Sequence, residues 1–388
     1  MRILYIQNSL VPPPLDLRAD RFSLLSESLE GDVLQPVWLS TPEEVETTFG
    51  PGSYPVYTVG RFRYHWFLSH ATQTASERLA MFRFYIRKAR ELHRERPFDC
   101  IVAYSHMMPG VIAAILKLLT GARLIIEIAT TPEQAYLTSR PLPSWSDRLL
   151  HQYSNLCLHF SVGLANRAHF LYPNHLGAYR FLRQTPNSVF HDFVPVSTVP
   201  RAQPQDSTLN IVLVGAPWFL KGADILIRAF HQIAPEFPEA KLQILGHFPN
   251  DKEELLALTN GSPKIEILRA RPNPETLQII SQAAVLVLPS RCEGMGRVLI
   301  EAMAAGIPVV GSKVGGIPFM IQHGDNGFLF PCEDVQALAD ILRRLLTDPG
   351  LRRTIGEHGY QRAHQHLNEA VYVEHFTRMV EDAVRGNP

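Results

Sequence analysis

The sequence predicts an α/β protein of two doubly wound halves, and three observations support this fold class. The chain of 388 residues is long enough for two domains, and its 46% hydrophobic content suffices for real cores. Apolar runs of strand length alternate with helix-length segments in both halves, which is typical of parallel sheets covered on both faces. The polar, proline-rich residues 195–208 interrupt this alternation and indicate a linker. We therefore expect two Rossmann-like domains facing a central cleft at their strand carboxyl ends.

The individual elements follow from apolar runs and from the residues that end them. In the first half, strands are expected at residues 2–7, 32–39, 100–105 and 124–129, and helices at 16–29, 76–94 and 109–119. In the second half, strands are expected at 210–214, 242–245, 265–268, 284–288 and 308–310, and helices at 334–343 and 351–384. Gly306 followed by Pro308 marks a helix end. The expected domains are residues 1–200, residues 201–365, and a C-terminal helix, 366–388, that packs back on the first domain.

Composition excludes several classes of protein. Lysine plus arginine and aspartate plus glutamate are equal at 37 each, so no bulk charge is available to hold a nucleic acid. The four cysteines are far apart and show no zinc-ligand spacing, which predicts no metal site and favours a reducing cytoplasm. The N-terminus lacks the apolar core of a signal peptide, and no apolar run is long enough to span a bilayer.

The most informative motif is SRCEGMGRVLIE, residues 290–301. It places Glu293 and Glu301 on either side of the turn Gly294-Met295-Gly296, between an apolar strand and a helix. Such a loop lets backbone N–H groups and a helix N-terminus approach an anion, while the two carboxylates accept hydrogen bonds from hydroxyl groups. A ligand with hydroxyls at both ends and phosphate between them is a sugar nucleotide. As a single residue, either glutamate is equally an ordinary acid stabilised by the helix dipole.

A second loop, GAPWFLKG, follows the first strand of the second half. Gly215 ends that strand, and Lys221 stands at the start of a helix, where a lysine meets a phosphate that faces the helix N-terminus. The alternative for Lys221 is a solvated surface side chain. Because Gly215 and Glu293 follow strands of the same parallel sheet, we expect them at one edge. Gly315-Gly316 forms either a third glycine loop or a plain turn.

Candidates in the first half are His106 and Glu127, each near a strand end. His106 at a cleft can bind an acceptor or move a proton, or it is a half-buried loop residue. Glu127 lies in an apolar strand and needs a partner, which can equally be the backbone. His191 and Asp192 carry the same ambiguity.

The segment 61–96 is rich in arginine and aromatic residues. This composition fits peripheral contact with the inner membrane surface or an acidic acceptor. The alternative, which we favour, is a helix with an aromatic core face and a solvated basic face.

These motifs resemble the nucleotide-sugar-binding half of retaining glycosyltransferases of family 4, which have the GT-B fold. EGMGRVLIEAMAAGIPVVGSKVGGIPFMIQHGDNGFLF is similar to the family's E-x7-E region, VGAPWFLKGADILIRAF to its glycine-to-lysine loop, and TDPGLRRTIGEHGYQRA to its tail. The resemblance covers roughly residues 209–375, whereas the first half shares only the layout.

The resemblance implies a role for each matching position. Glu293 would bind donor-sugar hydroxyls, Glu301 the ribose, and Lys221 a phosphate, with the backbone of Met295, Gly296 and Arg297 facing the diphosphate. Members usually need no divalent metal, so no cofactor is expected. The implied function is sugar transfer with retention from a nucleotide-diphosphate sugar to a glycan, lipid or small-molecule acceptor, as in polysaccharide or other glycoconjugate biosynthesis. A non-catalytic nucleotide-sugar-binding subunit and another GT-B enzyme, such as an epimerase, remain the alternatives.

The sequence departs from the family at three places. Ala216 stands where many relatives have a phosphate-binding arginine, and Arg297 is a candidate to replace it. Ala129-Thr130-Thr131 stands where relatives often have a cleft histidine, and Val11-Pro12-Pro13-Pro14 replaces the N-terminal glycine loop.

Overall fold

The computed structural model describes residues 1–7, 16–37, 41–69, 74–128, 144–173, 184–202, 209–248 and 252–387. The chain divides into two compact units. The first unit comprises Met1–Ala129, Gln152–Phe193 and Ala370–Pro388, and the second comprises Thr130–His151 and Val194–Glu369.

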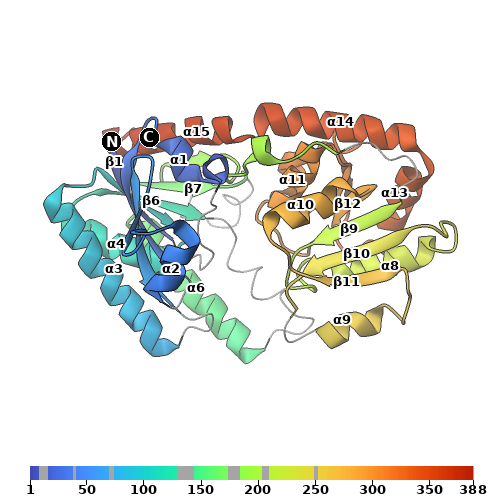
Figure 1. Ribbon diagram of the computed structural model, residues 1–388, viewed down its shortest axis with the longest axis horizontal. Helices are drawn as coiled ribbons and strands as arrows, with labels where there is room; N and C mark the ends of the chain where they lie inside the picture. Colours follow the sequence, from blue (N-terminus) through green and yellow to red (C-terminus); the bar gives the residue numbers. More distant parts are fainter. Residues whose placement is uncertain are drawn as a thin grey trace. The chain divides into compact units, whose positions relative to one another are not determined.

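The first unit is built on an eight-stranded sheet with the order β3-β4-β2-β1-β5-β6-β7-β8 (Figure 1). Its strands are β1 Arg2–Ile6, β2 Glu30–Val37, β3 Val56–Val59, β4 Phe62–Leu68, β5 Cys100–Tyr104, β6 Arg123–Ile128, β7 Arg167–Phe170 and β8 Asn187–Val189. Neighbouring strands pair in parallel except for the edge strand β3, which runs antiparallel to β4. The central strands are buried along their length, as expected when helices cover both faces.

Helices cover the two faces of this sheet in separate layers. One layer is α3 Ala75–Glu95, α4 Met108–Thr120 and α6 Trp145–Gly163, which share one hydrophobic cluster with the strands. The other holds α1 Arg21–Leu25, α2 Pro42–Phe49 and α15 Glu369–Arg385, and its cluster contains Tyr5, Tyr64 and Trp66. A short 3-10 helix, η1 Leu17–Ala19, precedes α1.

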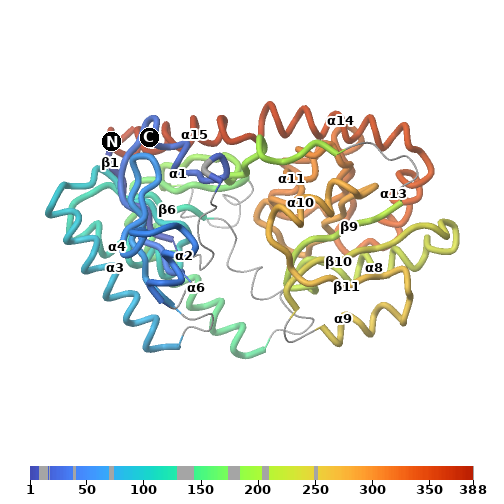
Figure 2. The backbone as a smooth tube through the Cα atoms, in the orientation of Figure 1, coloured from blue at the N-terminus to red at the C-terminus, as the bar shows by residue number. Residues whose placement is uncertain are grey.

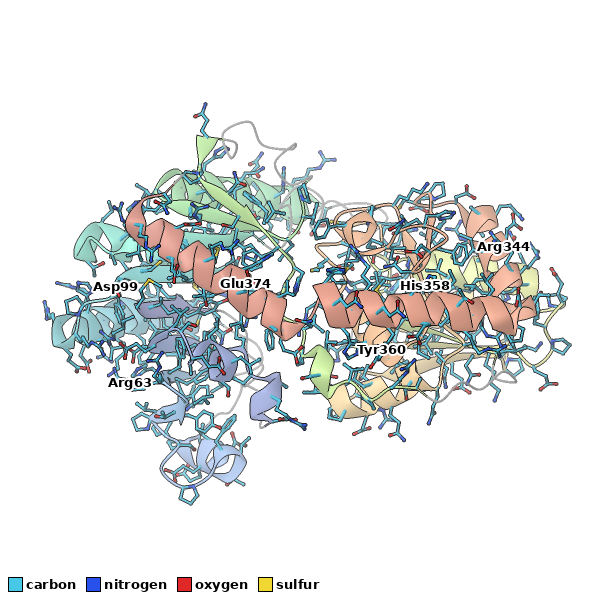
Figure 3. The ribbon with its side chains drawn as sticks, turned by 90° about the horizontal axis from the view of Figure 1, so that it is seen from above. Arg63, Asp99, Arg344, His358, Tyr360 and Glu374 are labelled. Carbon is cyan, nitrogen blue, oxygen red and sulfur yellow. The ribbon has the colours of Figure 1, made fainter. Side chains whose placement is uncertain are left out.

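The last helix, α15, belongs to the core of the first unit. Tyr372, Phe376, Met379 and Val380 recur at helical spacing and are almost completely buried. Phe190 and Phe193 pack edge-on against the Tyr372 ring. Exposed Glu374 lies on the same helix (Figure 3) and pairs with Arg378. The middle of α15 therefore contacts the first strand, where the Phe376 ring lies against Tyr5, and its end lies against β7, where Arg167 donates to the Asn387 carbonyl. Figure 2 shows both ends of the trace in this unit.

The second unit has a six-stranded parallel sheet with the order β11-β10-β9-β12-β13-β14. Its strands are β9 Asn210–Val214, β10 Lys241–Gly246, β11 Ile265–Arg269, β12 Val285–Leu288, β13 Val309–Ser312 and β14 Phe328–Phe330. Its helices are η3 Val196–Thr198, α8 Ala223–Ile233, α9 Lys252–Leu258, α10 Asn273–Ser281, α11 Arg297–Ala305, α12 Ile317–Met320, α13 Val335–Thr347 and α14 Pro349–His366. The prediction of two doubly wound α/β halves is confirmed.

Several elements differ from the prediction. The sequence did not indicate α6, β7, β8 or the β3–β4 hairpin, and the helix expected at 16–29 is reduced to η1 and α1. The long helix expected at 351–384 is two helices, α14 and α15, with a break at residues 367–368. The departures at Val11–Pro14 and Ala129–Thr131, and most of the polar end of the linker, lie outside the described residues.

Candidate functional site

Three loops of the second unit meet at one edge of its sheet. They follow β9, β12 and β13, which are neighbours in the sheet, and each leaves the carboxyl end of its strand. The first loop carries Gly215 and Lys221, the second carries Glu293 and Gly294, and the third carries Gly315. In a parallel sheet, this edge is where ligands bind.

Lys221 and Glu293 form an ion pair at this edge. The Lys221 Nζ atom lies 2.6 Å from Glu293 Oε2, and the side chains are 20% and 9% exposed. The Ser290 hydroxyl donates to the same carboxylate oxygen at 3.2 Å, and the Gly294 N–H donates to the other at 3.1 Å. The carboxylate is therefore held in one orientation, and it fixes the ammonium group beside it. The two residues singled out in separate motifs thus come together.

Glycines allow these loops to approach each other closely. Gly315 has φ +51°, and a Cβ atom there would lie 1.7 Å from the Glu293 carbonyl oxygen. Gly222, at φ +72°, faces the Pro289 carbonyl oxygen in the same way, at 2.0 Å. The Gly316 N–H also donates to the Gly294 carbonyl at 2.8 Å. Gly315-Gly316 is therefore part of the frame that holds the Glu293 loop.

Arg291 connects the loops through ion pairs and hydrogen bonds, and the sequence did not predict this role. Its guanidinium donates to both carboxylate oxygens of Asp224 at 2.7 Å and to Glu333 at 2.5 Å, and its side chain is only 9% exposed. It also donates to the Phe219 carbonyl and stacks 3.7 Å from the Phe219 ring centroid. An arginine two residues before Glu293 was the available signal. Its acidic partners lie far away in the sequence, so spacing alone did not reveal the cluster.

The helix that follows the Glu293 loop presents its N-terminus at the same edge. Gly296, at φ +77°, caps α11 without a side-chain hydrogen bond, and exposed Arg297 opens the helix. The positive end of the helix dipole thus accompanies Lys221 and Arg297.

Glu301 lies one turn further along α11. It accepts a long 3.5 Å hydrogen bond from the Asn273 amide, a second residue that the sequence did not indicate. Burial raises the pKa of the Glu301 carboxyl, and the positive charge of Arg297 partly opposes this effect. A ligand hydroxyl would supply the hydrogen-bond donor that this carboxylate lacks.

The two first-unit candidates are buried inside their own unit. His106 Nε2 lies 2.9 Å from the Ser154 hydroxyl, and burial lowers the pKa of His106 to about 4. Glu127 accepts a hydrogen bond from Tyr5 and lies 3.0 Å from His169 Nδ1. Both are thus engaged in internal hydrogen bonds. For Glu127 the partners are side chains rather than the expected backbone.

Asp192 belongs to the same buried polar cluster as Glu127. The Tyr104 hydroxyl donates to Asp192 at 3.1 Å, and Arg21 lies 3.8 Å from it. Arg21 also donates to the Tyr5 hydroxyl at 2.8 Å and to Tyr372 on α15 at 3.3 Å. Neighbouring His191 is buried, which lowers its pKa.

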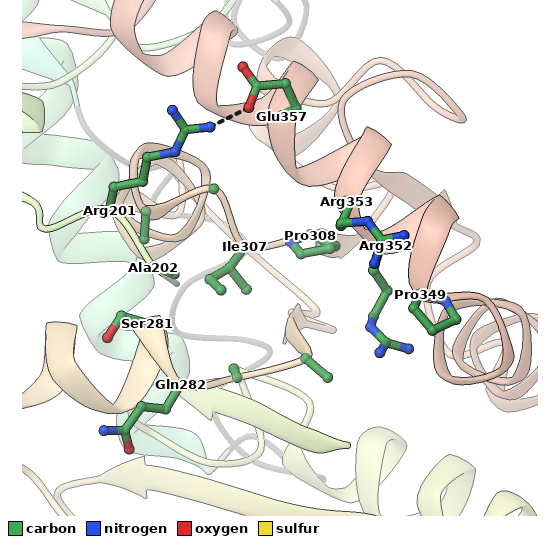
Figure 4. Close-up of a pocket in the computed structure, with 14 residues that line it drawn as sticks. Arg201, Ala202, Ser281, Gln282, Ile307, Pro308, Pro349, Arg352, Arg353 and Glu357 are labelled. Carbon is green, nitrogen blue, oxygen red and sulfur yellow. Dashed lines mark hydrogen bonds and ion pairs between the residues drawn. The ribbon is translucent and has the colours of Figure 1, made fainter. Parts of the chain in front are cut away.

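A separate cavity of about 260 Å³ lies at the opposite edge of the second sheet (Figure 4). Residues 281–284 and 305–308, which line it, directly precede β12 and β13, whereas the Glu293 loop follows β12. Arg201, Arg352 and Glu357 complete its wall, and Arg201 pairs with Glu357. This cavity is distinct from the predicted sugar-nucleotide site.

Among the described residues, no group of three or more histidine, cysteine, aspartate or glutamate side chains is arranged to hold a metal ion. No helix among those residues is long and apolar enough to cross a membrane.

The fold and this site define a two-unit α/β protein with glycine loops and the Lys221–Glu293 ion pair at one sheet edge. The family described as "Glycosyl transferases group 1" matches residues 200–362, so this part of the chain is similar to that family's domain. The resemblance stated from the motifs is thereby confirmed for the second unit.

Two curated relatives illustrate the sequence similarity. N-acetyl-alpha-D-glucosaminyl L-malate synthase of Bacillus anthracis is 31% identical over 166 residues, 43% of each chain. A D-inositol 3-phosphate glycosyltransferase of Corynebacterium kroppenstedtii is 30% identical over 187 residues, 46% of this chain and 41% of the relative. The chain therefore spans less than half the length of the curated relatives it matches.

Solved structures extend the likeness to the whole chain. Sucrose-phosphate synthase from Thermosynechococcus elongatus has a TM-score of 0.77 at 17% identity and covers 98% of both chains. Anabaena HepE in complex with UDP and glucose has a TM-score of 0.72 at 17% identity, covering 98% of this chain and all of HepE. At such identities the likeness establishes the fold, and the expected GT-B fold is confirmed.

Proposed function

We propose that this protein is a retaining glycosyltransferase that transfers a sugar from a nucleotide-diphosphate sugar to a hydroxyl acceptor. The observation that carries the proposal is the Lys221–Glu293 pair, set among glycine loops at the carboxyl edge of the second sheet. The match of residues 200–362 to the glycosyl transferases group 1 family supports it. The crystal structures of Anabaena HepE in complex with UDP-glucose and with UDP support a nucleotide-sugar donor.

Each residue of the site has a defined task in this proposal. The acceptor oxygen bonds to the anomeric carbon as the bond from that carbon to the diphosphate breaks, and the acceptor proton passes to the departing diphosphate. Lys221 and the N-terminus of α11 stabilise the negative charge that builds on the diphosphate, with about 3 kcal/mol expected for a good donor. Glu293 binds donor-sugar hydroxyls, and Glu301, beside Asn273, binds the ribose.

Glu293→Gln tests the proposal in the purified full chain. We measure sugar transfer and donor hydrolysis across UDP-, GDP-, ADP-, CDP- and dTDP-sugars, and donor binding by thermal shift. The variant should lose turnover and keep its fold. Glu239→Gln, an exposed glutamate of the same unit, is the matched control and should behave as wild type.

The same measurements separate the alternatives. If the protein binds a donor but shows no turnover with any donor or acceptor, it is a nucleotide-sugar-binding subunit and not an enzyme. Conversion of the donor sugar without an acceptor would indicate an epimerase. Transfer that survives Glu293→Gln would contradict the assignment of the site.

Arg297 is proposed to replace the phosphate-binding arginine that is absent at Ala216. It is exposed at the first position of α11, where a guanidinium accompanies the helix N-terminus. Arg297→Ala should raise the donor KM or lower kcat about tenfold, the effect of losing about 1.4 kcal/mol of binding. Steady-state kinetics that match wild type would discard this role.

Metal dependence, compartment, acceptor and membrane contact are further proposals. We propose that transfer needs no divalent metal, because Lys221 and the α11 N-terminus supply positive charge, and activity should then survive EDTA. A cytoplasmic setting is supported by four free cysteines. The acceptor is proposed to be a glycan, lipid or small molecule. Peripheral membrane contact is proposed through segment 61–96, most of whose arginines lie on β4 and α3.

A further inference from the structure

Helix α6 exposes an apolar stripe to solvent. In the part of α6 that belongs to the first unit, Tyr153, Leu156 and Phe160 follow one another at i+3 and i+4 positions, so they lie on one face of the helix. Tyr153 is 51% exposed and Leu156 is 68% exposed. The face of α6 that packs on the sheet contains small or polar Ser154, Cys157 and Ser161 beside Leu158 and Val162. An ordinary surface helix has the opposite polarity, so this stripe calls for a partner.

The apolar surface continues on α4, which lies in the same helix layer of the first unit. Leu118 and Leu119 in its last turn are 66% and 53% exposed. The two helices are joined near their buried sides, where the Ser161 hydroxyl donates to the His106 carbonyl just before α4. Both helices share the hydrophobic cluster that also contains α3. The exposed leucines and the α6 stripe thus belong to one layer.

The third helix of that layer adds a row of positive charge. Arg83, Arg87, Arg90 and Arg94 of α3, with Phe82 and Ile86, line a groove of about 300 Å³. The four arginines lie opposite Met81, Tyr85 and Ala89, which pack on the sheet, so they point outward. Within the described parts of the chain, none of the four guanidinium groups forms an ion pair, so their charge is available to an anionic partner.

We propose that the outward surface of α3, α4 and α6, the lipid face, docks on an anionic lipid bilayer. The α4 and α6 side chains enter the acyl boundary, and the α3 arginines pair with lipid phosphates. Charge decides against a second copy of the chain as the occupant, because a symmetric dimer would bring two identical arginine rows toward each other. The inference rests on the membrane contact proposed above and assigns its apolar part to α4 and α6, outside segment 61–96.

Vesicle flotation of the full-length protein without nucleotide sugar tests the lipid face. Wild-type protein should float with vesicles of phosphatidylcholine and phosphatidylglycerol, and much less with phosphatidylcholine alone. Replacing Leu156 and Phe160 together by glutamate should weaken binding to the mixed vesicles about tenfold or more. Arg87→Glu with Arg90→Glu should weaken it about tenfold and abolish the preference for phosphatidylglycerol.

Matched controls carry the same changes outside the lipid face. Leu256→Glu alters a 44% exposed leucine on α9, and Lys241→Glu reverses an exposed charge on β10. Both should float like wild type, and circular dichroism of every variant checks the fold.

Three results would overturn the lipid face: wild-type protein that does not float, flotation that survives the Leu156 and Phe160 replacement, or a dimer that this replacement converts to a monomer. Donor turnover, measured on the same preparations with a water-soluble acceptor, is independent of flotation. If the protein does not bind vesicles but shows normal turnover, only the proposal of the lipid face is contradicted. If it floats normally but shows no turnover, only the proposed glycosyltransferase activity is contradicted.

Discussion

At the scale of single residues, the site depends on side chains that touch no predicted ligand. Arg291 is nearly buried between Asp224 and Glu333, and it ties the Glu293 loop to the start of α8, where Lys221 approaches. Motif reasoning located Lys221 and Glu293, because glycines and a following helix surround them in the sequence. It could not locate Arg291, because the reason for an arginine there lies in partners that only the fold brings near.

Arg291→Ala should therefore destabilise the second unit strongly. The change removes the bidentate partner of Asp224, which keeps only its contact with exposed Arg228. Breaking a buried ion pair costs up to about 3–5 kcal/mol. The donor KM should also rise, because the two loops lose their connection. Arg228→Ala is the matched control, since Arg228 contacts the same two acids but its side chain is 54% exposed. Its effect should stay below about 1 kcal/mol. Chemical denaturation and donor kinetics are measured for both variants. Equal losses of stability in Arg291→Ala and Arg228→Ala would refute the role of Arg291 in connecting the loops.

His106 predicts a pH dependence of stability. Its pKa falls from the ordinary 6.5 to about 4 in the folded protein because the imidazole is buried. Between these values the unfolded chain binds a proton that the folded chain does not, so stability falls as the pH drops through this window and is fully present above it. The contribution is on the order of 3 kcal/mol.

His106→Gln should flatten the rise of unfolding free energy between pH 4 and 6.5. The slope against pH is the informative quantity, because the variant also changes the hydrogen bond to Ser154 and so lowers stability at every pH. An unchanged slope would show that the pKa of His106 is the same in the folded and the unfolded chain.

At the scale of elements, the glycine loops fix the distance between neighbouring strand ends. Gly315→Ala places a methyl group against the Glu293 carbonyl and forces a left-handed conformation on alanine. We expect a loss of about 3 kcal/mol or more, together with a fall in turnover. Gly324→Ala is the control, because Gly324 has φ +81° and open space around it. That change should cost only about 1 kcal/mol and leave turnover unaltered, as thermal unfolding and kinetics can show.

The elements that the sequence did not reveal share a physical cause. Strands β9 to β13 are short apolar runs bounded by glycine and proline, so periodicity identified them. Helix α6 buries serine and cysteine and exposes leucine and tryptophan, so its pattern contradicts the usual relation between polarity and burial. The break between α14 and α15 contains no proline, and only the change of packing partner at residues 367–368 marks it.

At the scale of the molecule, the chain completes its first unit with its last helix. Tyr372 and Phe376 of α15 pack against strands formed by the first residues, and Arg21 donates to the hydroxyls of both Tyr5 and Tyr372. The nucleotide-sugar motifs predict the second unit from local sequence alone. The first unit has no comparable motif, and its candidates His106 and Glu127 are held in internal hydrogen bonds.

Truncation after Leu367 should consequently unfold the first unit and leave the second folded. It removes four large side chains that are at most 1% exposed: Tyr372, Phe376, Met379 and Val380. Losses of about 2–5 kcal/mol for each of these four side chains amount to about 8–20 kcal/mol, which is as large as the stability of an ordinary domain, about 5–15 kcal/mol. Removal of residues 386–388 is the control and should cost only about 1–3 kcal/mol, because it deletes the hydrogen bond from Arg167 to the Asn387 carbonyl and two bonds from Asn387 to Asp382.

Calorimetry and donor thermal shifts distinguish the outcomes of this truncation. The shortened protein should show one remaining transition that a nucleotide-diphosphate sugar still raises, because the loops of Lys221 and Glu293 belong to the second unit. An unfolding profile identical to that of the full chain would mean that α15 adds no stability to the first unit. Loss of every transition would mean that the second unit cannot fold alone, and the local sequence motifs would then be insufficient to specify its structure.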